Sequence, residues 1–380
     1  MRALRVLITN YVMSNWTGTE LFARELALEL LRRGHTPIVY TTQIGELGQR
    51  LRDATIPVTD DLSTLPAPPD IIHGQHHVET MTALLHFNEA PALFYCHGWL
   101  PWEERPPRHP RIYRYVAADD TCRDRLTWEG GIALERTRVI LNSVDLERFK
   151  PRPPLPAKPR RALVFSNDAL EHASVVREAC ERAGVSLDVA GKDSGRVFEE
   201  PEKILGRYDL VFAKGRSALE ALAVGAAVVL CDAVGRGPLV TSQEVASLRR
   251  LNFGVRALQD ELSAEALFRE ISRYDAADAA EVSQKVRADA DRGRAFDEIV
   301  SLYGEVVEEH RAAPLDAGAE GRAAAAYLRW AMTGARAERT EFLSSAAGRL
   351  RQWAVAAPVL GPLIQSAGKK IRGSKGKRMS

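Results

Sequence analysis

The chain has 380 residues and a mass of 42.0 kDa, with 45% hydrophobic and 27% charged residues and a formal net charge of +2. This composition is that of an ordinary globular protein and excludes a disordered or collagen-like chain, while the length predicts two or three domains. The four cysteines lie far apart without a CxxC pair, which excludes a disulfide framework and a cysteine-based zinc site.

The first 150 residues alternate short apolar runs with helical periodicity. After the first run, a polar stretch containing Gly18 leads into a helix that ends at Gly34, and the next run follows at once. These three elements predict a right-handed β-α-β unit with parallel strands. Predicted strands occupy residues 4–9, 36–42, 70–74, 92–96, 112–118 and 138–141.

A proline-rich stretch at 151–159 interrupts this alternation and predicts a linker. The alternation then resumes, which predicts a second α/β domain. Its strands are expected at 162–166, 186–190, 210–213 and 227–231, and its helices at 173–183 and 217–223. Residues 263–310 have a helical pattern throughout, and an Ala/Arg-rich segment follows.

Charge is distributed unevenly along the chain. Residues 314–380 contain 12 Lys/Arg and 4 Asp/Glu, which leaves 40 Lys/Arg and 46 Asp/Glu in the body. A nucleic-acid-binding protein would carry its basic stripe on the folded body, so we expect no nucleic-acid partner. We expect the tail either to attach to an anionic membrane surface or to remain solvated. Its last six cations are Lys369, Lys370, Arg372, Lys375, Lys377 and Arg378.

The sequence also bears on location. No run of about 18 apolar residues is present, so no transmembrane helix is predicted. The first apolar stretch is short and soon becomes polar, unlike a secretory signal peptide. We therefore expect a cytoplasmic enzyme, peripheral on the inner face of the membrane if the tail binds lipid.

Five local strings follow one another in a characteristic order. They are Thr-Gly-Thr-Glu at 17–20, Asp-Ile-Ile-His at 70–73, Leu-Phe-Tyr-Cys-His-Gly at 93–98, Asn-Ser-Val-Asp-Leu-Glu-Arg-Phe at 142–149 and Ala-Leu-Glu-Ala-Leu-Ala-Val-Gly-Ala-Ala-Val-Val at 218–229. In order and spacing they resemble the motifs of GT-B glycosyltransferases, in particular the retaining glycosyltransferase family 4.

The resemblance implies an α/β GT-B fold, in which two Rossmann-like domains face a central cleft, with a helical C-terminal extension. It implies an acceptor-side domain at 1–150, a nucleotide-sugar-binding domain at 151–260, helices at 261–312 that return to the first domain, and an extension at 313–380.

The same resemblance implies an activity. A sugar would pass from a nucleotide-diphosphate donor to a hydroxyl acceptor with retention of configuration. The donor is a co-substrate, and no other cofactor and no catalytic metal is expected. The acceptor is expected to be a glycan, a lipid-linked molecule or a small molecule in glycan, polysaccharide or glycolipid biosynthesis.

Three positions depart from the family pattern. Phe212 stands eight residues before Glu220, where the family has a first glutamate. Residues 166–172 lack the Arg/Lys pair that grips the donor diphosphate, and the loop at 17–20 has one glycine instead of two. These departures keep two alternatives open: a non-catalytic nucleotide-sugar-binding or partner subunit of the same fold, and a nucleotide-sugar epimerase.

The main donor-binding candidates lie around one helix of the second domain. Lys214, Arg216 and Ser217 stand at its predicted start, where free amides and nearby cations favour an anion, so Lys214 or Arg216 is expected to replace the missing pair. Glu220 can accept two hydroxyl hydrogen bonds, which suits a ribose diol, and the resemblance implies the same role. The alternatives are solvated loop cations and a glutamate favoured by the helix dipole.

Two glycine-containing loops are further candidates. Gly235 and Gly237 would allow backbone to approach a phosphate closely, and Arg236 would add charge. Gly18, where the first strand turns into a helix, would let amides face a phosphate or an acceptor, with Thr19 beside it. An ordinary tight turn is the alternative at both places.

Histidines supply the remaining candidates. His97 ends a buried strand, so its ring is expected to point into the cleft, and the resemblance implies contact with the donor sugar or the reacting centre. A core histidine bonded to backbone is the alternative. Strand alternation would place His73, Gln75 and His77 on one face, but a fourth metal ligand is lacking. We expect His73 and His76 to make polar contacts with substrate instead.

Overall fold

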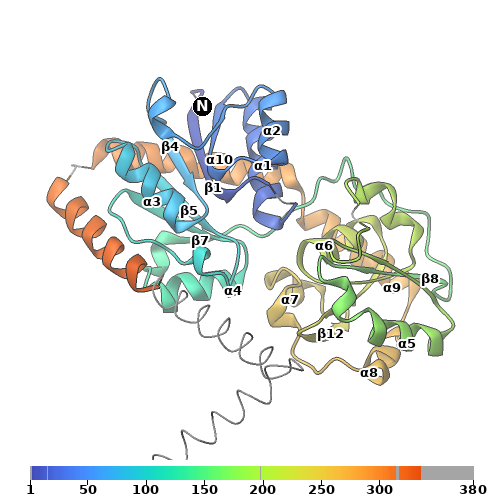
Figure 1. Ribbon diagram of the computed structural model, residues 1–380. Helices are drawn as coiled ribbons and strands as arrows, with labels where there is room; N and C mark the ends of the chain where they lie inside the picture. Colours follow the sequence, from blue (N-terminus) through green and yellow to red (C-terminus); the bar gives the residue numbers. More distant parts are fainter. Residues whose placement is uncertain (1, 15, 197, 314–315, 335–380) are drawn as a thin grey trace, which may run out of the picture. The chain divides into compact units, whose positions relative to one another are not determined.

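The computed structural model describes residues 2–14, 16–196, 198–313 and 316–334. Residues 1–315 form one compact unit and residues 316–380 another. The first unit contains two lobes, each built on its own β-sheet (Figure 1). The proline-rich segment at 151–159 lies between the lobes in sequence and contains neither helix nor strand, as its prolines predict.

The first lobe contains a seven-stranded sheet in the order β3-β2-β1-β4-β5-β6-β7, and every neighbouring pair is parallel. Its inner strands are continuous apolar runs because both faces are covered by helices. The strands are β1 (Arg5–Val12), β2 (Thr36–Gln43), β3 (Val58–Thr59), β4 (Ile71–Gly74), β5 (Ala92–Cys96), β6 (Ile112–Ala117) and β7 (Thr137–Val139).

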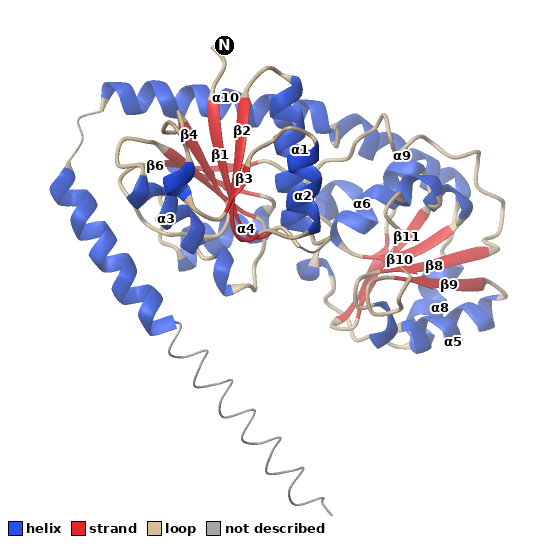
Figure 2. Cartoon of the chain, turned by 45° about the horizontal axis from the view of Figure 1, so that its top comes forward, coloured by secondary structure: helices blue, strands red, loops and turns tan. Residues whose placement is uncertain are grey.

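Helices connect these strands by crossovers. Chain order reverses between β1 and β4, so right-handed crossovers place α1 and α3 on opposite faces of the sheet (Figure 2). The helices of this lobe are α1 (Gly18–Arg32), α2 (Glu46–Asp53), α3 (His77–His86) and α4 (Asp120–Asp124), which continues into a π-helical turn, η3 (Arg125–Glu129). The reversal makes a topological switch point, where ligands of open α/β sheets bind.

The second lobe contains a five-stranded sheet in the order β12-β11-β10-β8-β9. Its strands are β8 (Arg161–Phe165), β9 (Ser186–Ala190), β10 (Leu210–Ala213), β11 (Ala227–Asp232) and β12 (Gly235–Leu239). Its helices are α5 (Ala173–Ala183), α6 (Gly215–Val224), α7 (Val245–Arg250), α8 (Ala264–Ser272) and α9 (Ala276–Asp289). β12 is antiparallel to β11, and the other pairs are parallel. Chain order reverses here between β8 and β10, which gives a second switch point.

The segment expected to return to the first domain divides between the lobes. Leu267 and Ile271 of α8 and Ala279 of α9 are buried in the core of the second lobe. Only α10 (Arg292–Ala312) packs against β4, β5 and β6 of the first lobe. The expectation for 261–312 is therefore corrected to α10 alone, because the apolar faces of α8 and α9 are already covered where they stand.

The second unit is described over residues 316–334, and residues 317–334 are helical. In the parts of the chain that the structure covers, no helix combines the length and apolarity needed to cross a bilayer. The basic tail, with its six cations and residues 342–364, lies outside the described residues.

Removing the side chain of Phe296 tests the docking of α10. Phe296 is 2% exposed, and its ring lies 6.0 Å from that of Phe22 on α1. We expect Phe296→Ala to lower the free energy of unfolding by about 3–5 kcal/mol, through lost burial and the cavity left behind. The exposed Ser301→Ala on the same helix should change it by less than about 0.5 kcal/mol. Equal denaturant midpoints for the two variants would contradict this packing.

Candidate functional site

A cavity of about 1340 Å³ is lined by both lobes at the carboxyl ends of their strands. The first lobe contributes residues that follow β1, β5 and β6, and the second contributes residues that follow β8, β9 and β10. Both switch points therefore open onto the same space, which makes it the candidate site. Among the lining residues are Thr17, Gly18, His97, Asp119, Ser166, Asn167, Lys192, Lys214, Arg216, Ser217 and Glu220.

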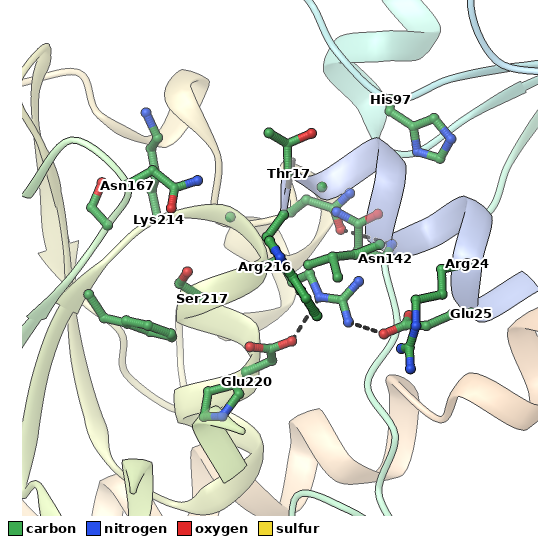
Figure 3. Close-up of a pocket in the computed structure, with 18 of the residues that line it drawn as sticks. Thr17, Arg24, Glu25, His97, Asn142, Asn167, Lys214, Arg216, Ser217 and Glu220 are labelled. Carbon is green, nitrogen blue, oxygen red and sulfur yellow. Dashed lines mark hydrogen bonds and ion pairs between the residues drawn. The ribbon is translucent and has the colours of Figure 1, made fainter. Parts of the chain in front are cut away.

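Arg216 connects the two lobes inside this cavity (Figure 3). Its Nε donates to Oε1 of Glu220 on the same helix at 2.8 Å, and its Nη2 donates to Oε1 of Glu25 on α1. Burial by itself would lower the pKa of Arg216, but the two carboxylates raise it overall. Burial also raises the pKa of Glu220, against the effect of Arg216. The three groups form a charge cluster that spans the lobes.

The amino end of α6 faces the cavity beside a second cation. In the described part of the chain no side chain caps this end, and Gly215 adopts φ +58°, a conformation that favours glycine. Lys214 immediately precedes the helix and forms an ion pair with Asp232 at the end of β11. Burial lowers the pKa of Lys214, and the charges of Asp168 and Glu171 oppose that effect. The amide of Gly215 donates to the carbonyl of Phe253 at 2.8 Å, so the amides of Arg216 and Ser217, together with the ammonium group, are those that can hold an anion.

The amino end of α1 is occupied by contrast. Glu20 accepts hydrogen bonds from the backbone N–H of Ser14 at 3.2 Å and from the backbone N–H and side chain of Thr17 at 3.0 and 2.7 Å. Its carboxylate therefore already provides the negative charge that a helix start prefers. A phosphate placed at Gly18 would meet this carboxylate, so α6 is the better anion site of the two helices.

His97 lies across the cavity, directly after β5. Its ring stacks on that of Tyr95 with centroids 4.3 Å apart and packs against Phe22 at 4.5 Å. Burial holds the pKa of His97 well below its usual value, with further lowering from His73 and His76. No hydrogen-bond partner for its Nε2 exists among the described residues. Nε2 is buried, so a hydroxyl group in the cavity can meet this fixed, neutral imidazole only at its other nitrogen, Nδ1.

The segment after His97 is held by two buried side chains that sequence analysis missed. Oε2 of Glu104 accepts the backbone N–H of His97 at 2.8 Å, and Arg125 donates to the carbonyls of Gly98 and Pro101 at 2.7 Å each. Burial raises the pKa of Glu104 to about 8, although Arg125 opposes it. Glu104 follows a proline and another glutamate in a loop, a pattern typical of exposed charge, so no signal in the sequence could have indicated it.

Glu104 and His76 do not form an ion pair. Their atoms Oε1 and Nε2 are 3.9 Å apart, which is too long for a hydrogen bond. Burial lowers the pKa of His76 to about 4 and raises that of Glu104 to about 8, so both groups are neutral near pH 7. The contact is therefore one between two uncharged groups.

Comparison with known proteins bears on this geometry. Residues 16–148 match the model of Glycosyltransferase Family 4. No curated protein matches the chain in sequence. Several solved structures match its fold, with coverage that extends through the second lobe.

A glycosyltransferase from Rickettsia africae ESF-5 is 14% identical, covers 81% of this chain and 99% of its own, and has a TM-score of 0.58. Anabaena Alr3699/HepE, solved with UDP and glucose, is 15% identical over 79% and 99%, also with a TM-score of 0.58. A putative UDP-N-acetylglucosamine 2-epimerase from Listeria monocytogenes is 12% identical over 83% and 99%, with a TM-score of 0.51.

The chain has the GT-B fold of these glycosyltransferases, and its residues 16–148 resemble Glycosyltransferase Family 4. The expected α/β fold of two Rossmann-like lobes is confirmed. The family match covers the first lobe and does not extend to the second. The departures from the family pattern in the second lobe therefore bear on whether this chain binds a donor there. Phe212 lies in β10 and is fully buried in the core, and residues 166–168, which line the cavity, contain no cation.

The structure brings most of the predicted site residues together at this cavity. The cavity is lined by Gly18, His97, Lys214, Arg216, Ser217 and Glu220. Thr19 is not among the lining residues, although the two residues before it, Thr17 and Gly18, line the cavity. Their individual roles stay predictions.

Gly235, Arg236 and Gly237 do not reach the cavity, and their predicted phosphate-binding role is not retained. They belong to β12, an antiparallel edge strand, and do not line the cavity. Arg236 pairs with Asp260 at 3.2 Å and Glu270 at 3.5 Å. A Cβ at Gly237 would lie 2.4 Å from a backbone oxygen, so this glycine serves packing. The sequence favoured a loop here because glycines and a proline disfavour a strand interior.

His73 and His76 also lie away from the lining, so the structure does not support their predicted substrate contacts. His73 is fully buried, with Nδ1 2.7 Å from the hydroxyl of Tyr303 on α10. His76 accepts the backbone N–H of Tyr11 at 2.8 Å. The strand ends at Gly74, so the predicted alternation of side chains stops before His77, which begins α3. No group of three His, Cys, Asp or Glu suited to a metal occurs within the described ranges.

The variant Glu104→Gln tests the buried carboxyl group. A carboxyl whose pKa rises from 4.5 to about 8 on folding stabilises the fold at low pH and loses that contribution as the pH rises toward 8. Glutamine keeps an oxygen for the N–H of His97 but does not titrate. We expect the melting temperature of the variant, relative to wild type, to rise between pH 5 and pH 8.

The neighbouring Glu103→Gln is the matched control, because Glu103 accepts no hydrogen bond from the backbone of His97. Its melting temperature should follow that of the wild type across the same pH range. Parallel melting curves for Glu104→Gln and wild type would show that the Glu104 carboxyl does not titrate differently on folding.

Proposed function

We propose that this chain is a glycosyltransferase, which transfers a sugar from a nucleotide-diphosphate donor to a hydroxyl acceptor with retention at the anomeric carbon. The observation that carries the proposal is the placement of an uncapped helix start and Lys214 on one side of a cavity and His97 on the other. One side suits an anion and the other suits a neutral polyol, as a nucleotide sugar requires.

In the proposed reaction the bond between the anomeric carbon and a phosphate oxygen breaks, and the acceptor oxygen bonds to that carbon. The bond pair stays on the departing diphosphate, whose charge the amides of α6 and Lys214 stabilise. The proton of the acceptor hydroxyl leaves to the diphosphate oxygen. Lys214 takes the place of the family's missing cations, because residues 166–168 offer none.

Two further residues act on other parts of the donor in this proposal. His97 binds a sugar hydroxyl through Nδ1, and its stacking on Tyr95 fixes the ring. Glu220 binds the ribose through Oε2, because Oε1 is already bonded to Arg216. Arg216 is held by two carboxylates, whereas Lys214 is paired with one, Asp232, so we assign the diphosphate to Lys214 instead.

Replacing Lys214 tests the donor site. Loss of a charge-assisted hydrogen bond costs about 1.5–3 kcal/mol, so Lys214→Gln should weaken UDP binding by roughly 10- to 150-fold in calorimetric titration. Lys285→Gln, an exposed lysine of α9 paired with Glu281, is the control and should bind as wild type. Unchanged affinity in a folded Lys214→Gln variant would remove Lys214 from the site. In the same titration, wild type should bind UDP more tightly than 2′-deoxy-UDP. Glu220→Gln should lose this preference for ribose.

The same protein distinguishes the remaining alternatives. Release of UDP only when an acceptor is present supports a transferase, whereas isomerisation of the donor without acceptor supports the epimerase alternative, whose fold the Listeria protein shares. No binding of UDP, ADP or GDP supports the non-catalytic alternative. Proton NMR of the anomeric signal in donor and product tests retention.

We also propose that the chain works in the cytoplasm and binds the inner membrane face through its basic tail. Six cations near an anionic leaflet contribute about 1 kcal/mol each before screening. The full chain should sediment with vesicles containing anionic lipid, and a variant with glutamine at all six positions should stay in the supernatant. Equal sedimentation of both proteins would contradict attachment by this tail.

A further inference from the structure

Arg24 is an unpaired cation at the edge of the cavity. It lies on α1, lines the cavity and is half-buried. The described residues provide its guanidinium with neither a hydrogen bond nor an ion pair. A half-buried guanidinium without a bonded partner is costly, and within the described residues no carboxylate is bonded to it.

The nearest acid does not serve Arg24. Glu25 follows it on the helix, but the carboxylate of Glu25 is bonded to Arg216 (Figure 3). Glu29, one turn further on, is bonded to Arg32 at 2.6 Å and to Arg33 at 2.7 Å. The acids along this face of α1 are therefore committed to other cations.

Three other arginines that line the cavity act on the charge of Arg24 through space. Burial lowers the pKa of Arg24; Glu25 raises it, and Arg148, Arg50 and Arg292 lower it further. Each of these three has its own carboxylate: Arg148 pairs with Glu202 at 2.7 Å, Arg50 with Glu46 at 2.7 Å and Arg292 with Asp145 at 2.8 Å. Of these four guanidinium groups, Arg24 is therefore the one without a carboxylate bonded to it among the described residues, and only Glu25 offsets its charge through space.

This position is separate from the proposed diphosphate site. Arg24 is six residues after the start of α1, which is about 9 Å along the helix axis. Figure 3 shows Lys214 and Arg24 on opposite sides of Arg216. The carboxylates of Glu25 and Glu220 lie between them, so one diphosphate bound at Lys214 would not approach Arg24 without meeting these acids.

We propose that Arg24 binds an oxyanion, a phosphate or a carboxylate, carried by the acceptor. The planar guanidinium offers two parallel N–H groups that match either oxyanion. The inference rests on the proposed transferase function only in assigning this ligand to the acceptor. It narrows the acceptor from any hydroxyl compound to one with a negative charge.

The test uses the full chain and three probes: glucose 1-phosphate, glucuronate and the neutral methyl glucoside. Binding is measured by calorimetry without nucleotide, so it does not depend on donor binding. We expect at least one anionic probe to bind wild type and methyl glucoside not to bind. Which anion binds identifies the oxyanion as phosphate or carboxylate.

Arg24→Gln should weaken binding of that anion about tenfold or more. Arg32→Gln is the matched control, because Arg32 lies on the same helix and lines the same cavity but is exposed and bonded to Glu29. It should bind the anion within about twofold of wild type. Melting temperatures confirm that each variant is folded.

Three results would overturn the proposal: no anion binding by wild type, equal binding of methyl glucoside, or unchanged affinity in Arg24→Gln. Dependence on Lys214 but not on Arg24 would place the anion at the donor side and also overturn it. Failure of UDP, ADP and GDP to bind, with Arg24-dependent anion binding intact, would reject the proposed transferase function and leave the anion site standing.

Discussion

The site depends on one guanidinium shared by two lobes. Arg216 lies on α6 of the second lobe and bonds to Glu220 beside it and to Glu25 on α1 of the first lobe. A guanidinium is planar and rigid, so its two carboxylates take a defined relative position. The start of α1 at Gly18 and the start of α6 after Lys214 therefore keep a defined position relative to each other across the cavity. Displacing either helix would expose a buried charge to water or leave it buried without its partner. Either outcome costs more free energy than losing a surface ion pair.

A second connection holds the lobes on another side of the cavity. Asn252 donates to the carbonyl of Ala118 in the first lobe and accepts the backbone N–H of Asn142 at 3.2 Å. Asn252 and Phe253 have φ of +48° and +52°, a region that a bulky side chain such as phenylalanine rarely adopts. Such strain persists only where surrounding contacts enforce it. Here it directs the buried Asn252 amide across to the first lobe, beside the ion pair of Arg250 with Asp120.

Sequence predicted the elements whose local and tertiary preferences agree. The apolar run at 92–96 is a strand with those bounds, because five consecutive buried residues suit a parallel sheet covered on both faces. β12 was missed because Gly235, Gly237 and Pro238 disfavour a strand, and only pairing with β11 makes it one. Lys214 could be placed at the cavity from sequence because it precedes a recognisable helix start. Glu104 could not be predicted as a site residue, because its burial depends on Arg125 and His97. Arg125 is distant in sequence, and no sequence pattern links Glu104 to His97.

The charges of the cavity divide it into unlike parts, and this division follows from how each helix start is satisfied. α1 uses its own Glu20, so its amino end is already neutralised, whereas α6 has no such acid and faces Lys214. The helix with the resident carboxylate therefore suits uncharged hydroxyl groups at its start, and the helix without one suits phosphate. Farther along α1 the balance changes again, because Glu25 neutralises Arg216 and leaves Arg24 without an acid. In the proposed donor site, Lys214 after β10 supplies the positive charge that residues 166–172, after β8, lack.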